Sequence, residues 1–401
     1  MGAKAVRQAG RHFLQIPGPS AVPDRILRAM DMPVQDHRGP GFGELGMSAV
    51  EGMKSIFKTA GPVVIYPSSG TGAWEAALVN VLSAGNKCVM VETGHFASLW
   101  AHLARKFELQ PEVIETDWRR GADPNLLEER LRVDSAHEIK AVCVVHNETS
   151  TGCTSRIAEI RKAIDAAGHP ALLMVDTISG LASADFRFDE WGVDVAVSGS
   201  QKGLMLPPGL SFNAVSEKAL EASKASTLAK SYWGWAEMIA ANATGYFPYT
   251  PATNMLYGLI EAVAMLHEEG LENVFARHKR HGEATRRAVQ AWGLEVQCQV
   301  EDEYSPVLTA VRVPDGYDAD ALRSVILKNF DMSLGNGLSK VQGKLFRIGH
   351  LGDFNDLMLA ATLSGVEMGL DLAGVPHQTG GVARALDYLK STAGENPWMK
   401  T

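Results

Sequence analysis

Short apolar runs alternate with helical patterns through the first half of the chain. Runs such as 62–67, 139–147 and 193–200 are continuous and rich in β-branched residues, which is typical of strands buried on both faces of a sheet. The expected strands are 62–67, 86–92, 111–116, 139–147, 171–176 and 193–200, and the expected helices are 73–82, 97–107, 124–132 and 155–167. This alternation predicts a mostly parallel sheet with helices on both faces.

The pattern changes in the second half. A long amphipathic helix is expected at 254–270, and after it strands at 294–300, 308–314 and 344–350 alternate with helices at 318–328 and 353–372. This predicts a smaller C-terminal α+β domain. We therefore expect an N-terminal arm over 1–20, a large domain over 21–265 and a small domain over 266–401. The Pro- and Gly-rich stretch 16–46 is expected to lie across a surface or to reach into a site.

Composition narrows the class of protein. The net charge of −8 and the absence of long basic runs argue against a nucleic-acid or membrane-surface partner. The first residues lack the apolar core of a signal peptide, and the four cysteines are scattered, so we expect reduced, mostly buried thiols and a cytoplasmic location. No His/Cys spacing suits a metal, since His278 and His281 are expected on a solvated helix.

Lys202 follows directly after the buried strand 193–200. Open α/β sheets bind their ligands at the carboxyl ends of the strands, and a lysine there is partly desolvated. Desolvation favours the neutral amine, which is the form that makes a Schiff base. The alternative is an ordinary solvated loop lysine.

Three further segments lie at strand ends. Ser69, Gly70, Thr71 and Gly72 separate a strand from a helix and could hold a phosphate at the helix N-terminus, although a plain glycine turn explains them too. Asp176 ends the strand 171–176 and could pair with a buried cation, or serve as a helix cap or surface ion pair. The polar stretch 146–152 follows the strand 139–147.

Arg347 lies within an apolar, strand-like run. A buried arginine is costly unless it meets an anion, and its planar fork suits a carboxylate. A structural ion pair is the alternative. Together, a phosphate turn, a carboxylate, an amine and a carboxylate clamp are the parts that hold pyridoxal 5′-phosphate (PLP) and an amino acid.

The segments SSGTGAWEAAL, HNETSTG, MVDTISG, SGSQKGLMLPPG and FRIGHLGD resemble the class V aminotransferases of PLP-dependent fold type I, nearest to the serine–glyoxylate and alanine–glyoxylate enzymes. The resemblance covers nearly the whole chain. It implies a seven-stranded type of sheet in the large domain, PLP as cofactor, and a homodimer with the site at the interface.

The resemblance also implies roles for single residues. Lys202 corresponds to the Schiff-base lysine and proton carrier, Asp176 to the partner of the pyridine nitrogen, and Arg347 to the substrate carboxylate clamp. The expected cofactor contacts are Ser69, Gly70, Thr71, Gly72, Phe96, Thr149, Asp176, Ile178, Gln201, Lys202, Tyr249 and Thr250. Phe96 stands where mammalian relatives have a stacked tryptophan. Tyr246 competes with Tyr249 as the tyrosine that reaches the neighbouring subunit's phosphate.

The expected reaction is ping-pong transfer of an amino group from serine, and also alanine, to glyoxylate, giving glycine and hydroxypyruvate or pyruvate. Gly18, Arg38 and Arg347 are the expected substrate contacts, and Arg38 on the Pro/Gly-rich stretch would matter for a second carboxylate. Aspartate–glyoxylate transamination is therefore an alternative. A cysteine desulfurase-like lyase is a further alternative, but it needs a reactive cysteine, and none lies in the loop before Arg347. A non-catalytic protein with this fold is the last alternative, and the presence of the lysine, the aspartate and the arginine argues against it.

Overall fold

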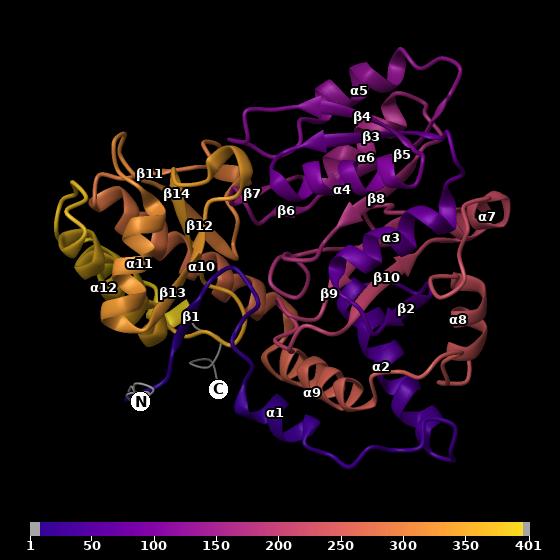
Figure 1. The fold of residues 1–401 in the computed structure, drawn as a ribbon, viewed down its shortest axis with the longest axis horizontal. Coiled ribbons are helices and arrows are strands. Elements are labelled where there is room, and N and C mark those ends of the chain that lie inside the picture. The colour runs from indigo at the N-terminus through magenta and orange to yellow at the C-terminus, as the bar shows by residue number, and fades with distance from the viewer. Residues whose placement is uncertain (1–8, 396–401) are drawn as a thin grey trace, which may run out of the picture.

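The computed structural model describes residues 9–395 and contains two main sheets and a two-stranded hairpin (Figure 1). The larger sheet has an apolar core on each face, and the smaller sheet has a core of its own. The outer parts of the predicted arm and small domain, 1–8 and 396–401, lie outside the described residues. The predicted domain boundaries near 20 and 265 stay predictions. Within the described residues, no helix is both long and apolar enough to cross a bilayer.

The larger sheet has seven strands and is mostly parallel, as predicted. In spatial order they are β2 (Val63–Tyr66), β10 (Ser211–Val215), β9 (Val195–Gly199), β8 (Leu172–Asp176), β5 (Ile139–Val145), β3 (Lys87–Glu92) and β4 (Gln110–Glu115). Only β10 runs antiparallel to its neighbours in this sheet. The carboxyl ends of the other strands therefore share one edge.

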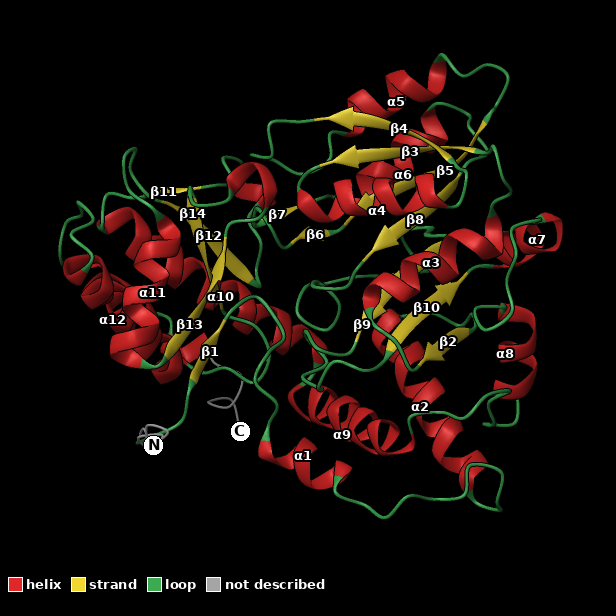
Figure 2. Ribbon diagram, in the orientation of Figure 1, coloured by secondary structure: helices red, strands yellow, loops and turns green. Residues whose placement is uncertain are grey.

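Helices cover both faces of this sheet (Figure 2), because alternate residues of the buried strands point to opposite sides. One face is packed by α1 (Asp24–Met30), α2 (Phe42–Phe57), α5 (Pro124–Arg132), α6 (Ile157–Ala166) and α9 (Thr253–Glu269). The other is packed by α3 (Gly70–Val81), α4 (His95–Lys106), α7 (Glu217–Ala225) and α8 (Trp235–Asn242). Within β8, Leu173 and Val175 join the first core, whereas Leu172 and Met174 join the second.

The smaller sheet has five strands. In spatial order they are β1 (Phe13–Gln15), β13 (Met332–Asn336), β14 (Leu345–Gly349), β12 (Leu308–Arg312) and β11 (Glu295–Val296). Its helices are α10 (Leu271–Ala291), α11 (Ala319–Phe330), α12 (Asp356–Leu372) and α13 (Gly381–Ser391). The remaining short elements are the hairpin β6 (Asn147–Glu148) and β7 (Cys153–Thr154) and the 3-10 turns η1 (Glu301–Glu303), η2 (Ser339–Val341) and η3 (Ala393–Glu395).

Two details differ from the sequence-based expectations. The segment expected as a separate arm adds β1 to the small sheet, where it pairs in parallel with β13. His278 and His281 were expected in solvent, and that prediction is wrong: they are 1% and 0% exposed. The sequence of α10 is polar on most sides, but α9, α12 and α13 pack around the helix and bury its histidines.

Candidate active site

Loops from several strands of the large sheet meet at its carboxyl edge. They enclose a cavity of about 130 Å³. It is lined by Ser69, Gly70, Thr71, Trp74, Phe96, Val145, Asn147, Thr149, Asp176, Ile178, Gln201 and Lys202. A larger cleft of about 740 Å³ in the small domain contains none of the predicted site residues. Most of the predicted cofactor contacts therefore gather where open α/β sheets hold their ligands.

Lys202 lies in the loop after β9 and is only 9% exposed. Its Nζ donates a hydrogen bond to the Pro17 carbonyl at 2.6 Å. Burial and the nearby charge of Arg347 lower the pKa of Lys202 to about 8, and Asp176 opposes this shift. About a tenth of the amine is therefore neutral and nucleophilic at pH 7, far more than for a solvated lysine.

Gly18 lies directly against this lysine. Its φ of +101° is in the region that favours glycine, and a Cβ added there would come within 2.3 Å of the Lys202 side chain. The same segment is tied to the lysine loop by Ser20, whose Oγ donates to the Lys202 carbonyl and whose N–H donates to the Gln201 carbonyl, both at 2.9 Å. A larger residue at position 18 would displace the amine.

Asp176 ends β8 and is 3% exposed. Its carboxylate accepts hydrogen bonds from the Ile178 amide at 2.7 Å and from Trp74 Nε1 at 2.9 Å. Burial raises the pKa of Asp176 to about 7, and the charge of Glu148 adds to the shift. No cation of the described residues lies within ion-pair distance, so a protonated ring nitrogen would stabilise this carboxylate.

The turn before α3 suits a phosphate. Ser69 precedes the helix in an extended conformation without capping it through its side chain, so the first N–H groups of α3 remain available. A Cβ on Gly70 would lie 2.3 Å from Ile178 Cδ1, which explains the need for glycine. Within the described residues, Gln201 Oε1 is buried without a hydrogen-bond partner. The carboxylate, the amine and this turn fit PLP.

Arg347 is held beside the cavity by β14 and is 6% exposed. Its Nε donates to the Asn336 carbonyl and its Nη1 to the Thr149 carbonyl, both at 2.8 Å. Burial lowers the pKa of Arg347 to about 10, whereas the negative charge of Glu148 favours its charged form. Among the described residues no carboxylate lies within ion-pair distance, so the structural ion pair considered above is absent.

Several predicted residues do not line this cavity. Gly72 packs against Ser68 and Trp233. The hydroxyl of half-buried Tyr249 donates to the Ser231 carbonyl and to Glu237, and Thr250 is exposed. Arg38 is also exposed, on the loop between α1 and α2. Within a single chain these residues stay outside the site.

Three residues that were not among the predicted contacts also line the cavity: Trp74, Val145 and Asn147. Asn147 lies within the polar stretch already noted after β5 and donates to Ser179 Oγ at 2.8 Å. Trp74 is one turn into α3, on the side that faces Asp176, and stacks on Trp100 with ring centroids 5.8 Å apart. The helical period places Trp74 beside the glycine turn and could have identified it.

This fold and this site define a PLP-dependent enzyme of fold type I. The family model described as "Aminotransferase class-V" matches residues 13–342. The chain belongs to the class V aminotransferases, and PLP is its cofactor.

Individual relatives agree with this family. The chain is 48% identical to a serine–glyoxylate aminotransferase of Methylorubrum extorquens over 99% of both chains. It is 45% identical to an L-aspartate–glyoxylate aminotransferase of Paracoccus denitrificans, over 94% of this chain and 96% of that one. The structure of pyridoxamine–pyruvate aminotransferase from Mesorhizobium loti superposes with a TM-score of 0.89 at 28% identity, covering 96% of this chain and 98% of that chain.

Proposed function

We propose that this aminotransferase moves the amino group of L-serine to glyoxylate, giving hydroxypyruvate and glycine, and that it also accepts alanine. The observation that carries the proposal is Arg347, a buried guanidinium beside the cavity without a carboxylate partner among the described residues. Donor and acceptor both have a carboxylate next to the reacting carbon. One arginine can therefore bind both in the two halves of a ping-pong reaction.

The remaining roles follow from placement. PLP, when bound, supplies an electron sink for negative charge on the substrate's α-carbon. Asp176 would hold the proton on the ring nitrogen. Lys202 Nζ would take the proton from the substrate's α-carbon and return it to C4′ of the cofactor. Phe96 and Ile178 would enclose the ring, since both line the cavity.

The polar lining would hold the ends of the cofactor. Ser69, Gly70 and Thr71, with Gln201, would bind the phosphate at the start of α3. Thr149 would bond the phenolic oxygen of the ring. Gly72 would contribute by allowing the turn to pack closely against Ser68.

Serine is favoured over aspartate as the donor by the charges around the cavity. Aspartate needs a second cation for its second carboxylate, and Lys202 is the only cation among the described residues that line the cavity. Arg38 is exposed in the single chain. The cysteine desulfurase alternative needs a mobile nucleophilic cysteine near PLP, whereas all four cysteines are free and buried.

Donor choice is tested by kcat/KM for serine, alanine and aspartate at fixed glyoxylate, in the wild type and in Arg38→Ala. We expect serine to exceed aspartate by about tenfold, which is about 1.4 kcal/mol of transition-state preference. Aspartate exceeding serine by that factor would contradict the proposal. Loss of such an aspartate preference in Arg38→Ala would then identify Arg38 as the second cation.

We further propose a cytoplasmic homodimer in which Tyr249 and Thr250 of one copy reach the phosphate of the other. Both lie outside the cavity of their own chain, and Thr250 is exposed. Light scattering should give the mass of two chains, and Thr250→Ala should weaken PLP binding. A single-chain mass with unchanged PLP affinity would exclude the shared site.

A further inference from the structure

Glu148 is a fully buried carboxylate that none of the proposed catalytic roles uses. It is 0% exposed and lies in β6, immediately before Thr149 of the cavity lining. Its backbone is fixed by pairing with Cys153 of β7, and its carbonyl accepts hydrogen bonds from the Thr151 and Gly152 amides. Burying a carboxylate is costly, so its contacts indicate what the charge does.

The carboxylate of Glu148 contacts the start of α4. One oxygen accepts from the Ala97 amide at 3.2 Å, and the other from the Phe96 amide at 3.4 Å. Ser150 completes the arrangement: its Oγ donates to Glu148 at 2.6 Å and accepts from the His95 amide at 2.9 Å. The first three N–H groups of α4 therefore end on these two side chains, and the anion lies at the positive end of the helix.

The packing at this point leaves little freedom. A Cβ on Gly94, which precedes α4, would lie 2.4 Å from Glu148 Cγ and 2.4 Å from Ser150 Oγ. Because Gly94, the N-cap residue of α4, has no side chain to cap the helix, the side chains of Glu148 and Ser150 bond its first amides instead. The first turn of α4, which carries Phe96, is thus held closely against Glu148 and Ser150.

Thr149, the residue after Glu148, connects this hairpin to Arg347, the proposed substrate clamp. The Thr149 carbonyl accepts from Arg347 Nη1 at 2.8 Å, and the charge of Glu148 favours the protonated guanidinium. One short hairpin therefore bonds both the helix that carries Phe96 and the arginine expected to bind carboxylates.

We propose that Glu148 is a positioning residue which, through the N-terminus of α4, holds the Phe96 ring against the bound PLP. The proposal rests on the proposed roles of Phe96 and Arg347, but not on the identity of the amino donor. The bonds from Glu148 to the α4 amides position the Phe96 ring, and the carbonyl of the next residue, Thr149, holds the carboxylate clamp Arg347.

The test compares Glu148→Gln with Glu303→Gln. Glu303 is a suitable control because it is also a buried carboxylate, 1% exposed, that accepts from a backbone amide, that of Gly121 at 2.8 Å, and it lies outside the cavity lining. It differs from Glu148 in pairing with Arg156 and Arg120, at 3.5 and 3.9 Å. In the glutamine variant of Glu148, we expect the PLP dissociation constant to rise about tenfold, as for the loss of charge-assisted hydrogen bonds. The visible circular dichroism of bound PLP should change. Glu303→Gln should alter neither quantity.

A double-mutant cycle with Phe96→Ala separates positioning from general destabilisation. If Glu148 acts through Phe96, Glu148→Gln should weaken PLP binding much less in the Phe96→Ala background than in the wild type. Fully additive effects would overturn the proposal, as would unchanged dichroism and affinity in Glu148→Gln. Should Glu148→Gln fail to fold, Ser150→Ala keeps the charge and must show a smaller change of the same kind.

The steady-state constants distinguish this proposal from the proposed function. Because the Thr149 carbonyl beside Glu148 bonds Arg347, and Arg347 is proposed to serve both substrates, Glu148→Gln should change KM for the donor and for the acceptor in the same direction. If serine is not the preferred donor but the dichroism and PLP affinity still change, only the proposed function fails. If serine is the donor and Glu148→Gln behaves as Glu303→Gln does, only the positioning role fails.

Discussion

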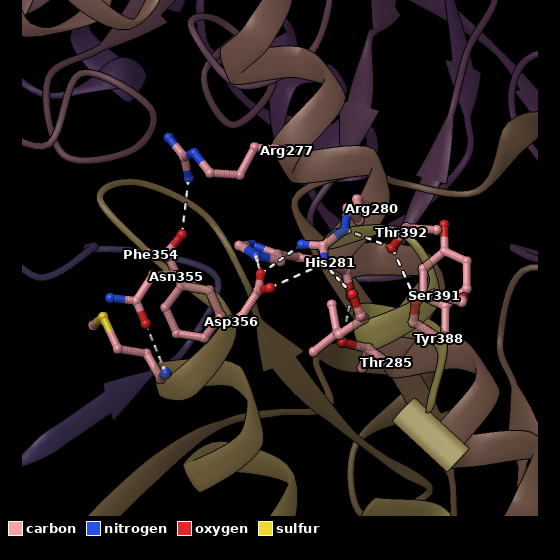
Figure 3. A network of polar contacts seen from close by, with 12 residues as sticks. Arg277, Arg280, His281, Thr285, Phe354, Asn355, Asp356, Tyr388, Ser391 and Thr392 are labelled. Atoms are coloured by element: carbon pink, nitrogen blue, oxygen red, sulfur yellow. Dashed lines mark hydrogen bonds and ion pairs between the residues drawn. The ribbon is translucent and has the colours of Figure 1, made fainter. Parts of the chain in front are cut away.

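Two arginines with the same 6% exposure have opposite surroundings. Arg280 in α10 makes two hydrogen bonds to the carboxylate of Asp356, at 2.5 and 2.9 Å (Figure 3). It also donates to Thr392 Oγ1 and to the Leu389 carbonyl, both at 2.7 Å. Arg347 at the sheet edge donates to two backbone carbonyls, and no carboxylate of the described residues pairs with it.

The two aspartates differ in the same way. Although burial acts to raise it, the pKa of Asp356 lies below its usual range because His281 and Arg280 bond the carboxylate. Over residues 9–395 no cation bonds Asp176, and burial raises the pKa of this carboxylate to about 7. In the small-domain network each charge has its partner within the chain, so it stabilises the fold. At the sheet edge, Asp176 and Arg347 bond only neutral groups among the described residues, which fits residues that bind a charged ligand.

The largest expected effect is at Lys202. Lys202→Ala should lower kcat by roughly 10²- to 10⁴-fold or more, because the proton carrier and the covalent attachment of PLP are both lost. The melting temperature should stay close to that of the wild type. Lys218→Ala is a suitable control, since Lys218 bonds the Ala171 carbonyl at the opposite edge of the sheet. Near-normal turnover of Lys202→Ala would refute the assignment.

The aspartates give the next largest contrast. Asp176→Asn should lower kcat on the order of a hundredfold, with a smaller loss of PLP affinity, because the carboxylate matters most when charge develops on the ring. Asp356→Asn should leave kcat unchanged and reduce the free energy of unfolding by about 2 kcal/mol. Rate measurements and denaturant titrations on both variants decide between these outcomes. An unchanged kcat in Asp176→Asn would remove its proposed role.

The arginines sharpen the comparison further. Arg347→Lys should cost roughly 2–4 kcal/mol in kcat/KM for donor and acceptor alike, since lysine cannot reproduce the paired N–H fork. Arg280→Lys should instead lower thermal stability with little change in kcat/KM. If Arg347→Lys impaired only one half-reaction, measured by single turnover with each substrate, Arg347 would not be the shared clamp.

The smallest expected effect concerns pH. Lys202 has a pKa of about 8, so its neutral fraction, and with it the rate at which cofactor-free protein captures PLP, should rise about tenfold between pH 7 and 9. The lowered pKa of Asp356 means that its contribution to stability is present above the usual carboxyl range and is lost as pH falls below about 4. The contribution of this network to the free energy of unfolding should therefore not change over pH 7–9.

Much of the site was predictable because it lies at strand ends. Once the βαβ alternation was recognised, Asp176 and Lys202 had to meet at one edge, since parallel strands end on the same side. Arg347 comes from the other sheet, and only its apolar surroundings suggested a function. The class V resemblance covered all three.

Other features depended on contacts that the sequence pattern does not contain. Neither β10 nor α2 was predicted. The antiparallel strand β10 follows a Pro/Gly turn and is interrupted by a polar residue, and α2 begins within a Gly-rich stretch that suggested a surface loop. Glu148 bonds α4 across a long sequence separation, so its neighbours gave no signal. His278 and His281 were misassigned because tertiary packing, rather than helix polarity, buries them.

The amine of Lys202, at the end of β9, is the group proposed to carry the cofactor. The direct measurement is borohydride reduction of the purified protein with bound PLP, followed by proteolysis and mass spectrometry of the modified peptide. We expect a single modified lysine, Lys202, and no covalent label in Lys202→Ala. A label on another lysine, or equal labelling of Lys202→Ala, would contradict it.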